Sequence, residues 1–161
     1  MAVTPQKGSH DASELRFGIV VSRFNSLVTD RLLAGALAEL RERGCTDENI
    51  HVVQVPGAVE LPLLAGALID TGNFDAIIAL GAVVRGETQH HHYISQAVVD
   101  ALQALALDNR IPVSLGVLTT ENMTQALQRA GDDPGNKGRE AAITAIECAN
   151  LLEQLPAPAL D

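Results

Sequence analysis

The sequence predicts an α/β fold in which a four-stranded parallel sheet is covered by helices on both faces. Two observations lead to this fold. Four short runs, at residues 15–21, 50–55, 76–84 and 113–118, are apolar almost throughout, which is typical of strands buried on both faces. The segments between them carry apolar residues at helical spacing, so strands and helices alternate along the chain. Because crossover connections are right-handed, such units build a doubly wound three-layer sandwich.

The first half of the chain contributes two strand–helix units. After the strand at 15–21, apolar residues keep helical spacing as far as Gly44, a residue typical of helix C-termini. After the strand at 50–55, the second helix carries Pro62 in its first turn, where a proline is tolerated. This helix is expected to end near Gly72.

The second half contributes two strands and three helices. The strand at 76–84 leads into a long helix, and the strand at 113–118 leads into a short helix that ends at Ala130. A turn-rich loop at 131–136 precedes a last helix that starts near Lys137. The apolar stripe of the long helix consists of Ile94, Ala97, Val98, Ala101, Leu102 and Leu105. That of the last helix consists of Ala142, Ala145, Ile146, Ala149 and Leu152.

Length and composition favour one domain with short terminal extensions. The 161 residues divide into a polar arm at 1–14, a domain at 15–155 and a tail at 156–161. The arm by itself is typical of a flexible terminus, and it lacks the apolar core of a signal peptide. No apolar run approaches the length of a membrane span. The two cysteines, Cys45 and Cys148, match no metal-ligand spacing and are interpreted as reduced thiols of a cytoplasmic protein.

Charge and aromatic content argue against a nucleic-acid partner. The formal net charge is -9, so a broad basic surface is not expected. Only 2% of the residues are aromatic, which leaves little for stacking successive bases. An anionic small molecule is still compatible with a few local positive groups. The charged fraction of 19% is somewhat low, which is a weak indication of subunit contacts.

The four loops that follow the strands are expected to form one ligand-binding surface, because ligands of open parallel sheets bind beyond the carboxyl ends of the strands. This surface would hold Phe24, Glu60, Arg85, Gly86 and His90. Each residue also has a simpler interpretation. The phenyl ring could plug the sheet end, the glutamate could favour a helix dipole, the arginine could pair with an acid, and the glycine could only turn the chain.

Three consecutive histidines, His90 to His92, open the long helix. Consecutive helical residues point about 100° apart, so three in a row cannot close on one metal ion. His90 lies nearest the strand end and can move protons near neutral pH, whereas His91 and His92 are expected to face solvent or a neighbouring subunit. The segments GDDPGNKG and PVSLG fail as a phosphate loop and a nucleophile elbow, and no dinucleotide fingerprint is present.

Five separated motifs carry a resemblance to a known family. They are SRFN at 22–25, VPGAVELP at 55–62, GAVVRGETQHHHY at 81–93, GVLTTEN at 116–122 and RAGDDPGNKG at 129–138. In this order and spacing, over about residues 15–155, the chain resembles the lumazine synthases. The resemblance implies a flavodoxin-like sandwich and no metal or organic cofactor. It also implies condensation of 5-amino-6-(D-ribitylamino)uracil with 3,4-dihydroxy-2-butanone 4-phosphate to 6,7-dimethyl-8-ribityllumazine, with loss of phosphate and water.

The resemblance also assigns expected roles to residues. His90 would carry protons, and Phe24 would stack on the ring. The other contacts to the ribitylaminouracil would come from Asn25, Ala58, Val59, Glu60, Ala82, Val83, Val84, Leu115 and Lys137. The phosphate would be bound by Gly86, Glu87, Thr88 and Arg129. Leu115 stands where many members carry a phenylalanine contributed by the neighbouring subunit, so it can cover the ring but cannot stack on it.

Assembly is a further implication of the resemblance. Members are homopentamers with active sites between adjacent subunits, and some pentamers form icosahedral shells. The loop at 131–136 has the short form of shell-forming members, and the arm at 1–14 would add a strand to a neighbour's sheet. Two other functions stay open at this point: an archaeal-type riboflavin synthase, and a non-catalytic cage or ligand-binding protein on the same scaffold.

Overall fold

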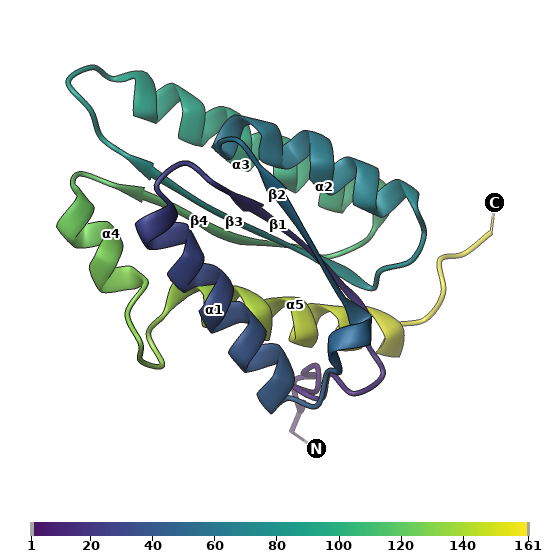
Figure 1. The fold of residues 1–161 in the computed structure, drawn as a ribbon. Helices are drawn as coiled ribbons and strands as arrows, with labels where there is room; N and C mark the ends of the chain where they lie inside the picture. Colours follow the sequence, from purple (N-terminus) through teal and green to yellow (C-terminus); the bar gives the residue numbers. More distant parts are fainter. Residues whose placement is uncertain (1, 161) are drawn as a thin grey trace.

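A four-stranded parallel sheet runs through the middle of the molecule, with helices packed on both faces (Figure 1). This computed structural model describes residues 2–160. The strands are β1 (Phe17–Ser22), β2 (Ile50–Val55), β3 (Ala76–Val84) and β4 (Val113–Thr120). Their order in the sheet is β2-β1-β3-β4, and every pair is parallel. The predicted fold class is therefore confirmed.

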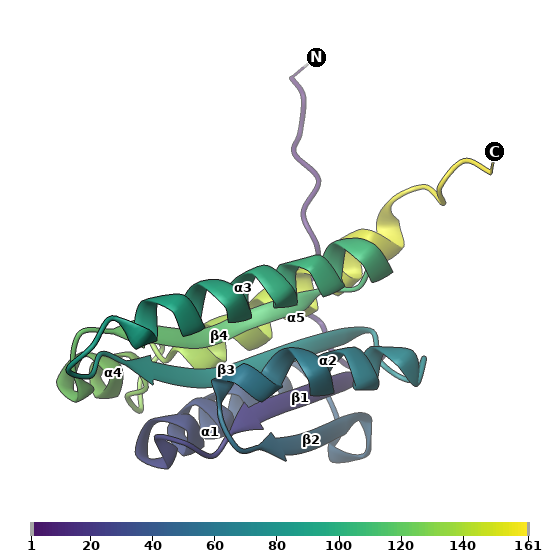
Figure 2. The same ribbon diagram turned by 90° about the horizontal axis from the view of Figure 1, so that it is seen from above.

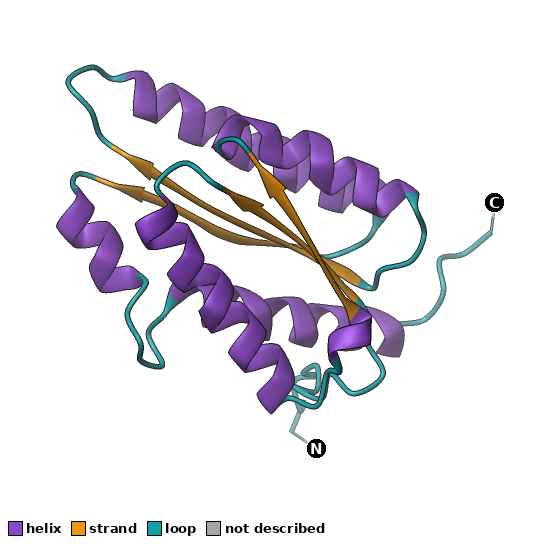
Figure 3. Ribbon diagram, in the orientation of Figure 1, coloured by secondary structure: helices purple, strands orange, loops and turns teal. Residues whose placement is uncertain are grey.

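Helices form the two outer layers, as Figure 3 shows by colour. They are α1 (Ser26–Glu42), α2 (Leu61–Asp70), α3 (His90–Asn109), α4 (Met123–Arg129) and α5 (Lys137–Gln154), with short 3₁₀ turns at Asp47–Asn49 and Ala58–Glu60. One face of the sheet is covered by α1 and α5, and the other by α2 and α3. Figure 2 shows α3 lying along β4 and α2 along β1 and β3. Gly44 and Gly72 follow α1 and α2 with positive φ, as expected for helix ends.

Side chains of the central strands alternate between two hydrophobic clusters. Phe17, Ile19 and Val21 pack toward α1 and α5, whereas Val20 and Ile77 pack toward α2 and α3. These five side chains are at most 1% exposed, and burying each stabilises the fold by about 1.5–3 kcal/mol. The demand for apolar residues on both faces explains why β1 and β3 are apolar without alternation.

Three details of the predicted core are wrong. His51, Val52 and Gln54 are exposed because β2 lies at the edge of the sheet, so this strand is not covered on both faces. In α3, Val98 and Leu102 are buried and Ile94 and Leu105 pack against the same cluster, as predicted, but Ala97 is exposed and Ser95 is buried in its place. Leu152 is 44% exposed near the end of α5.

The N-terminal segment lies along α5 of its own chain between residues 6 and 12. Gln6 donates to the Gln154 side chain at 3.3 Å, and a His10 ring nitrogen lies 3.0 Å from a Glu147 carboxylate oxygen. The Asn150 amide donates to the backbone carbonyl groups of residues 9 and 11. The residues before this segment run away from the body, as Figure 2 shows. The predicted strand in a neighbour's sheet stays a prediction.

A charged cluster joins α1 to α5 on the face of the sheet that these two helices cover. The Glu39 side chain is 7% exposed and accepts hydrogen bonds from Arg43 at 2.9 Å and Arg139 at 2.8 Å. Burial by itself raises the pKa of Glu39, but the two guanidinium groups outweigh it and hold the pKa below its ordinary value.

Both cysteines are free, as predicted. No helix within residues 2–160 is long and apolar enough to cross a membrane.

Candidate active site at the carboxyl ends of the strands

A cavity of about 340 Å³ lies where β1, β2 and β3 end and α3 begins. Its size falls in the range of small-molecule sites. It is lined by Phe24, Asn25, Gly57, Ala58, Val59, Glu60, Ala82, Val83, Val84, Gly86, Thr88, His90, His91 and Ile94. Residues predicted from three separate loops thus surround one space.

The loop after β1 presents Phe24 at the rim of the cavity. The N–H groups of Arg23 and Phe24 donate to the carbonyl groups of Val55 and Pro56, at 2.8 and 3.0 Å. These bonds hold the loop against the end of β2. The Phe24 side chain is 70% exposed, so it does not plug the sheet end and leaves a ring face open. An open phenyl face on a fixed loop can stack on a planar ligand.

Glu60 also lines the cavity, at the end of the 3₁₀ turn that precedes α2. One carboxylate oxygen accepts the backbone N–H of Gly57 at 3.0 Å, which orients the half-buried side chain. A carboxylate has further acceptor positions, so Glu60 can still receive hydrogen bonds from ligand hydroxyl groups. Val59 beside it is 58% exposed.

The segment between β3 and α3 supplies backbone N–H groups. Gly86 and Thr88 line the cavity, and the N-cap residue of α3, Gln89, makes no side-chain capping bond. The start of a helix attracts anions through its N–H groups and its dipole. Glu87 does not line the cavity, so its negative side chain is not part of the wall.

Arg85 is paired with an acid, as the simpler interpretation expected. Its guanidinium donates to the Glu121 carboxylate at 2.8 Å, and its backbone N–H donates to the Thr120 carbonyl at 2.9 Å. The Arg85 hydrogen bond is the main reason why the pKa of Glu121 is lowered. Arg85 is therefore not a wall of the cavity but a link between the loops that follow β3 and β4.

Two of the three histidines line the cavity. His90 is exposed there, and its backbone N–H lies 3.3 Å from the Thr88 hydroxyl. His91 is half-buried, and its Nδ1 lies 3.4 Å from the Thr88 carbonyl. The expectation that His91 faces solvent or a neighbouring subunit did not include this place in the cavity wall. The ring turns back over the preceding loop, which helix spacing alone does not indicate. His92 lies outside the cavity.

The chain matches the family model described as 6,7-dimethyl-8-ribityllumazine synthase over residues 14–153. This chain belongs to the lumazine synthase family. The matched residues include all four strands and every residue that lines the cavity. Membership supports a transferase-type enzyme of the riboflavin pathway.

Three residues expected in a lumazine synthase site lie away from the cavity of this chain. Leu115 is on β4 and is 38% exposed. Arg129 ends α4 and donates to the Gln125 carbonyl at 3.0 Å. Lys137 begins α5 and pairs with Glu140 at 2.7 Å. Among residues 2–160, no lysine or arginine lines the cavity.

The sequence prediction also missed two lining residues, His91 and Ile94. His91 lies inside a recognised motif, so its position was a usable signal. Ile94 was assigned to the core stripe of α3, and it is indeed partly buried against the cluster under α2 and α3. The first turn of α3 therefore serves both the core and the cavity.

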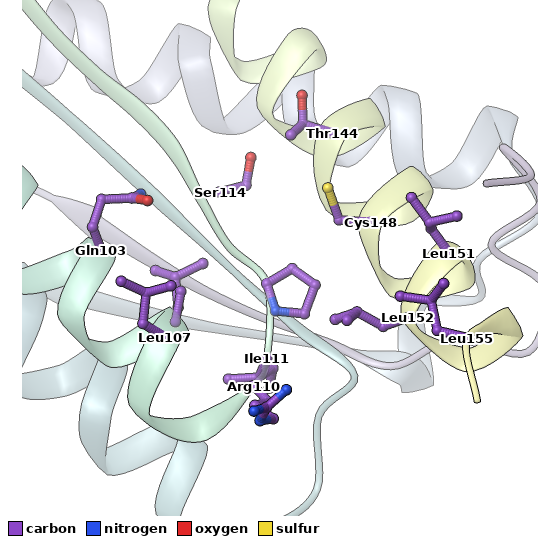
Figure 4. Close-up of a pocket in the computed structure, with 13 residues that line it drawn as sticks. Gln103, Leu107, Arg110, Ile111, Ser114, Thr144, Cys148, Leu151, Leu152 and Leu155 are labelled. Atoms are coloured by element: carbon purple, nitrogen blue, oxygen red, sulfur yellow. The ribbon is translucent and has the colours of Figure 1, made fainter. Parts of the chain in front are cut away.

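A larger hollow of about 600 Å³ lies at the opposite end of the sheet, between α3, the start of β4 and α5 (Figure 4). Most of its wall is aliphatic, including Leu107, Leu151 and Leu155. Cys148 also lines it, and partial desolvation together with Glu147 raises the pKa of this thiol. Among residues 2–160, no carboxylate or imidazole lies in this wall, which makes the hollow a poor place for proton transfer.

Proposed function

We propose that this chain catalyses the condensation of 5-amino-6-(D-ribitylamino)uracil with 3,4-dihydroxy-2-butanone 4-phosphate. The product is 6,7-dimethyl-8-ribityllumazine, and phosphate and water are released. One observation carries the proposal: Phe24, Glu60, Thr88 and His90, from three separate loops, line one cavity in a chain of the lumazine synthase family. They supply a stacking surface, an acceptor for hydroxyl groups, an anion cradle and a proton carrier.

The ribitylaminouracil binds across the ends of β1 and β3 in this proposal. Its ring stacks on the open face of Phe24 and meets backbone groups of Ala82, Val83 and Val84. Its ribityl chain runs past Ala58 and Val59 toward the Glu60 carboxylate. The carboxylate favours this chain because sugar hydroxyl groups donate to it.

The phosphate of the second substrate sits at the start of α3. Backbone N–H groups from Gly86 to Thr88 and the Thr88 hydroxyl are its donors. A phosphate also calls for a permanently charged cation, and within residues 2–160 no lysine or arginine lines the cavity of one chain. We assign this role to Arg129 of a second copy, together with Leu115 and Lys137 as further parts of the ring wall.

His90 moves the protons. The amine that attacks the ketone must lose a proton, the phosphate must leave, and the closing ring must release water. An imidazole with a pKa near ~6.5 can give and accept protons at neutral pH. Because amines and ketones combine readily, holding the two substrates in contact contributes most of the acceleration.

The assembly we propose is a homopentamer, with a shell of pentamers as a further step. β4 is an edge strand of the sheet, and the aliphatic hollow of Figure 4 lies beside its start. An unpaired edge next to an apolar hollow suits an added strand, such as the first residues of a neighbour's arm. A cytoplasmic location belongs to the same proposal and agrees with two free cysteines.

An absorbance assay with both substrates tests the proposed function. We expect lumazine to form at a rate proportional to the enzyme concentration. No acceleration over the spontaneous reaction would contradict the proposal. Supplying lumazine alone separates the riboflavin synthase alternative, which requires riboflavin as the product. Binding of the ribitylaminouracil without turnover would favour a ligand-binding or cage protein.

A further inference from the structure

Asn25 adopts a backbone conformation that most residues avoid. Its φ is 62° and its ψ is 44°, in the left-handed helical region. Within residues 2–160, Asn25 and Arg110 are the residues other than glycine with a positive φ. This conformation costs roughly 1–2 kcal/mol for most side chains, and asparagine tolerates it best. Asn25 also lines the cavity at the strand ends.

The Asn25 side chain closes a gap in the sheet. β1 pairs with β3 only as far as Val21 opposite Leu80, so the carbonyl of Ala82 lies beyond the last pair. The N–H group of Phe24, in the loop after β1, does not donate to β3. It donates to the carbonyl of Pro56, just after β2. The Asn25 amide reaches the Ala82 carbonyl and donates to it at 2.9 Å.

Helix capping does not explain this side chain. The N–H groups of Val28 and Thr29, in the first turn of α1, donate to the Asn25 backbone carbonyl at 2.9 and 3.0 Å. The side chain itself makes no capping bond. A replacement that tolerates the left-handed backbone therefore keeps the start of α1 and removes only the bond to β3.

The hydrogen bond from Asn25 affects which backbone groups of β3 remain available to a ligand ring. The N–H groups of Ile77 and Arg85 donate toward β4, and strand residues alternate in direction. The backbone N–H and C=O groups of Ala82 and Val84 therefore point away from β4, toward the side where β1 has ended and the cavity is open. One acceptor position of the Ala82 carbonyl is taken by Asn25, and the Val84 carbonyl is the next acceptor that faces this side.

We propose that Asn25 is a positioning residue for the ribitylaminouracil. Its amide fixes the Phe24 loop to the end of β3, which sets the distance between the stacking ring and the backbone edge. It also takes one acceptor position of the Ala82 carbonyl, which favours alignment of the uracil edge on Val84. This role rests on the proposed function, because it concerns the first substrate of that reaction.

Two substitutions separate the hydrogen bond from the backbone conformation. Asn25→Gly keeps the left-handed backbone and loses the donor. Asn25→Asp also tolerates this backbone, but it places a carboxylate against the Ala82 carbonyl. Asn109→Asp is the matched control, because the Asn109 amide makes a similar bond of 2.9 Å to the Leu105 carbonyl at the far end of α3.

We expect the KM for ribitylaminouracil to rise about 10-fold in Asn25→Gly, the equivalent of one lost hydrogen bond. The KM for the butanone phosphate should stay unchanged, and the melting temperature should fall by no more than about 4 °C. Asn25→Asp should show a larger rise at pH 8, and its excess over Asn25→Gly should shrink toward pH 5. The reason is that a protonated carboxyl can donate to the carbonyl. Asn109→Asp should match the wild type.

Other results would overturn the role of Asn25. They are an unchanged KM for ribitylaminouracil in Asn25→Gly, or equal rises in both KM values with a lower melting temperature. If the wild-type protein forms no lumazine, the proposed function fails and this role fails with it. Wild-type turnover with an unchanged KM in Asn25→Gly removes the role of Asn25 alone.

Discussion

Two hollows at opposite ends of the same sheet differ in chemistry more than in size. The cavity of about 340 Å³ at the strand ends combines a carboxylate, two imidazole rings and the start of α3. The hollow of about 600 Å³ at the start of β4 is mainly aliphatic. The strand ends are also where helices begin, so backbone N–H groups converge there. The comparison teaches that convergent polar groups, rather than volume, distinguish the end for which we propose catalysis.

Substitution of His90 should give the largest effect at the strand-end cavity. His90→Ala should lower kcat about 100-fold, the lower range for loss of a proton carrier, and leave both KM values nearly unchanged. Steady-state absorbance kinetics measure both constants. His92→Ala is the matched control, because His92 lies outside the cavity. Equal turnover of His90→Ala and the wild type would remove His90 from the mechanism.

Glu60→Gln tests the carboxylate in the same cavity. We expect the KM for ribitylaminouracil to rise about 10-fold, because a charged acceptor for hydroxyl groups becomes a neutral one. The KM for the butanone phosphate should not change. Glu48→Gln, which alters an exposed carboxylate outside the cavity, should leave both constants alone. A similar rise in both variants would show that only the net charge matters.

Leu107→Asp tests the aliphatic hollow. The Leu107 side chain is 78% exposed, so the substitution costs little stability in one chain. In the proposed assembly it places a charge in a covered surface, and light scattering should show smaller particles. Leu107→Met keeps the apolar character and is the control. An unchanged particle size for Leu107→Asp would place the subunit contact elsewhere.

Arg139→Met should have the smallest effect on catalysis, because Arg139 belongs to neither hollow. It removes one of two partners of buried Glu39, which should lower the free energy of unfolding by about 1–3 kcal/mol. The pKa of Glu39 is lowered in the folded state, so its contribution is present above the unfolded value near ~4.3 and is lost as pH falls through the folded value. Denaturant unfolding should therefore show a smaller difference at pH 3 than at pH 7. Equal differences at both pH values would contradict the role of the Glu39 charge.

The sequence predicts those parts of the fold that depend on local pattern. The bounds of β2 and β3 were predicted at residues 50–55 and 76–84, because turn residues enclose both apolar runs. The exposed surface of β2 was missed because it depends on strand order, which no local pattern contains. β4 extends two residues further than predicted, because Thr119 and Thr120 pair with the end of β3.

The site shows the same division. The loops that follow parallel strands could be grouped from the sequence, because strand direction alone brings them together. The orientation of His91 depends on the carbonyl of Thr88, and the bond from Asn25 depends on where β1 and β3 separate. Neither fact is encoded in residue spacing. Contacts of the arm with α5 are equally tertiary, since polar side chains such as His10 carry no pattern of their own.

Mixed assemblies of two inactive variants test most directly whether the cavity is catalytic and completed by a second copy. His90→Ala and Arg129→Ala would be co-expressed and assayed below the raised KM for the butanone phosphate. If one chain supplies His90 and its neighbour supplies Arg129, random mixing leaves about a quarter of the sites with both residues intact. We predict recovery toward a quarter of the wild-type rate. Activity no higher than the mean of the two separate variants would contradict a site shared between copies.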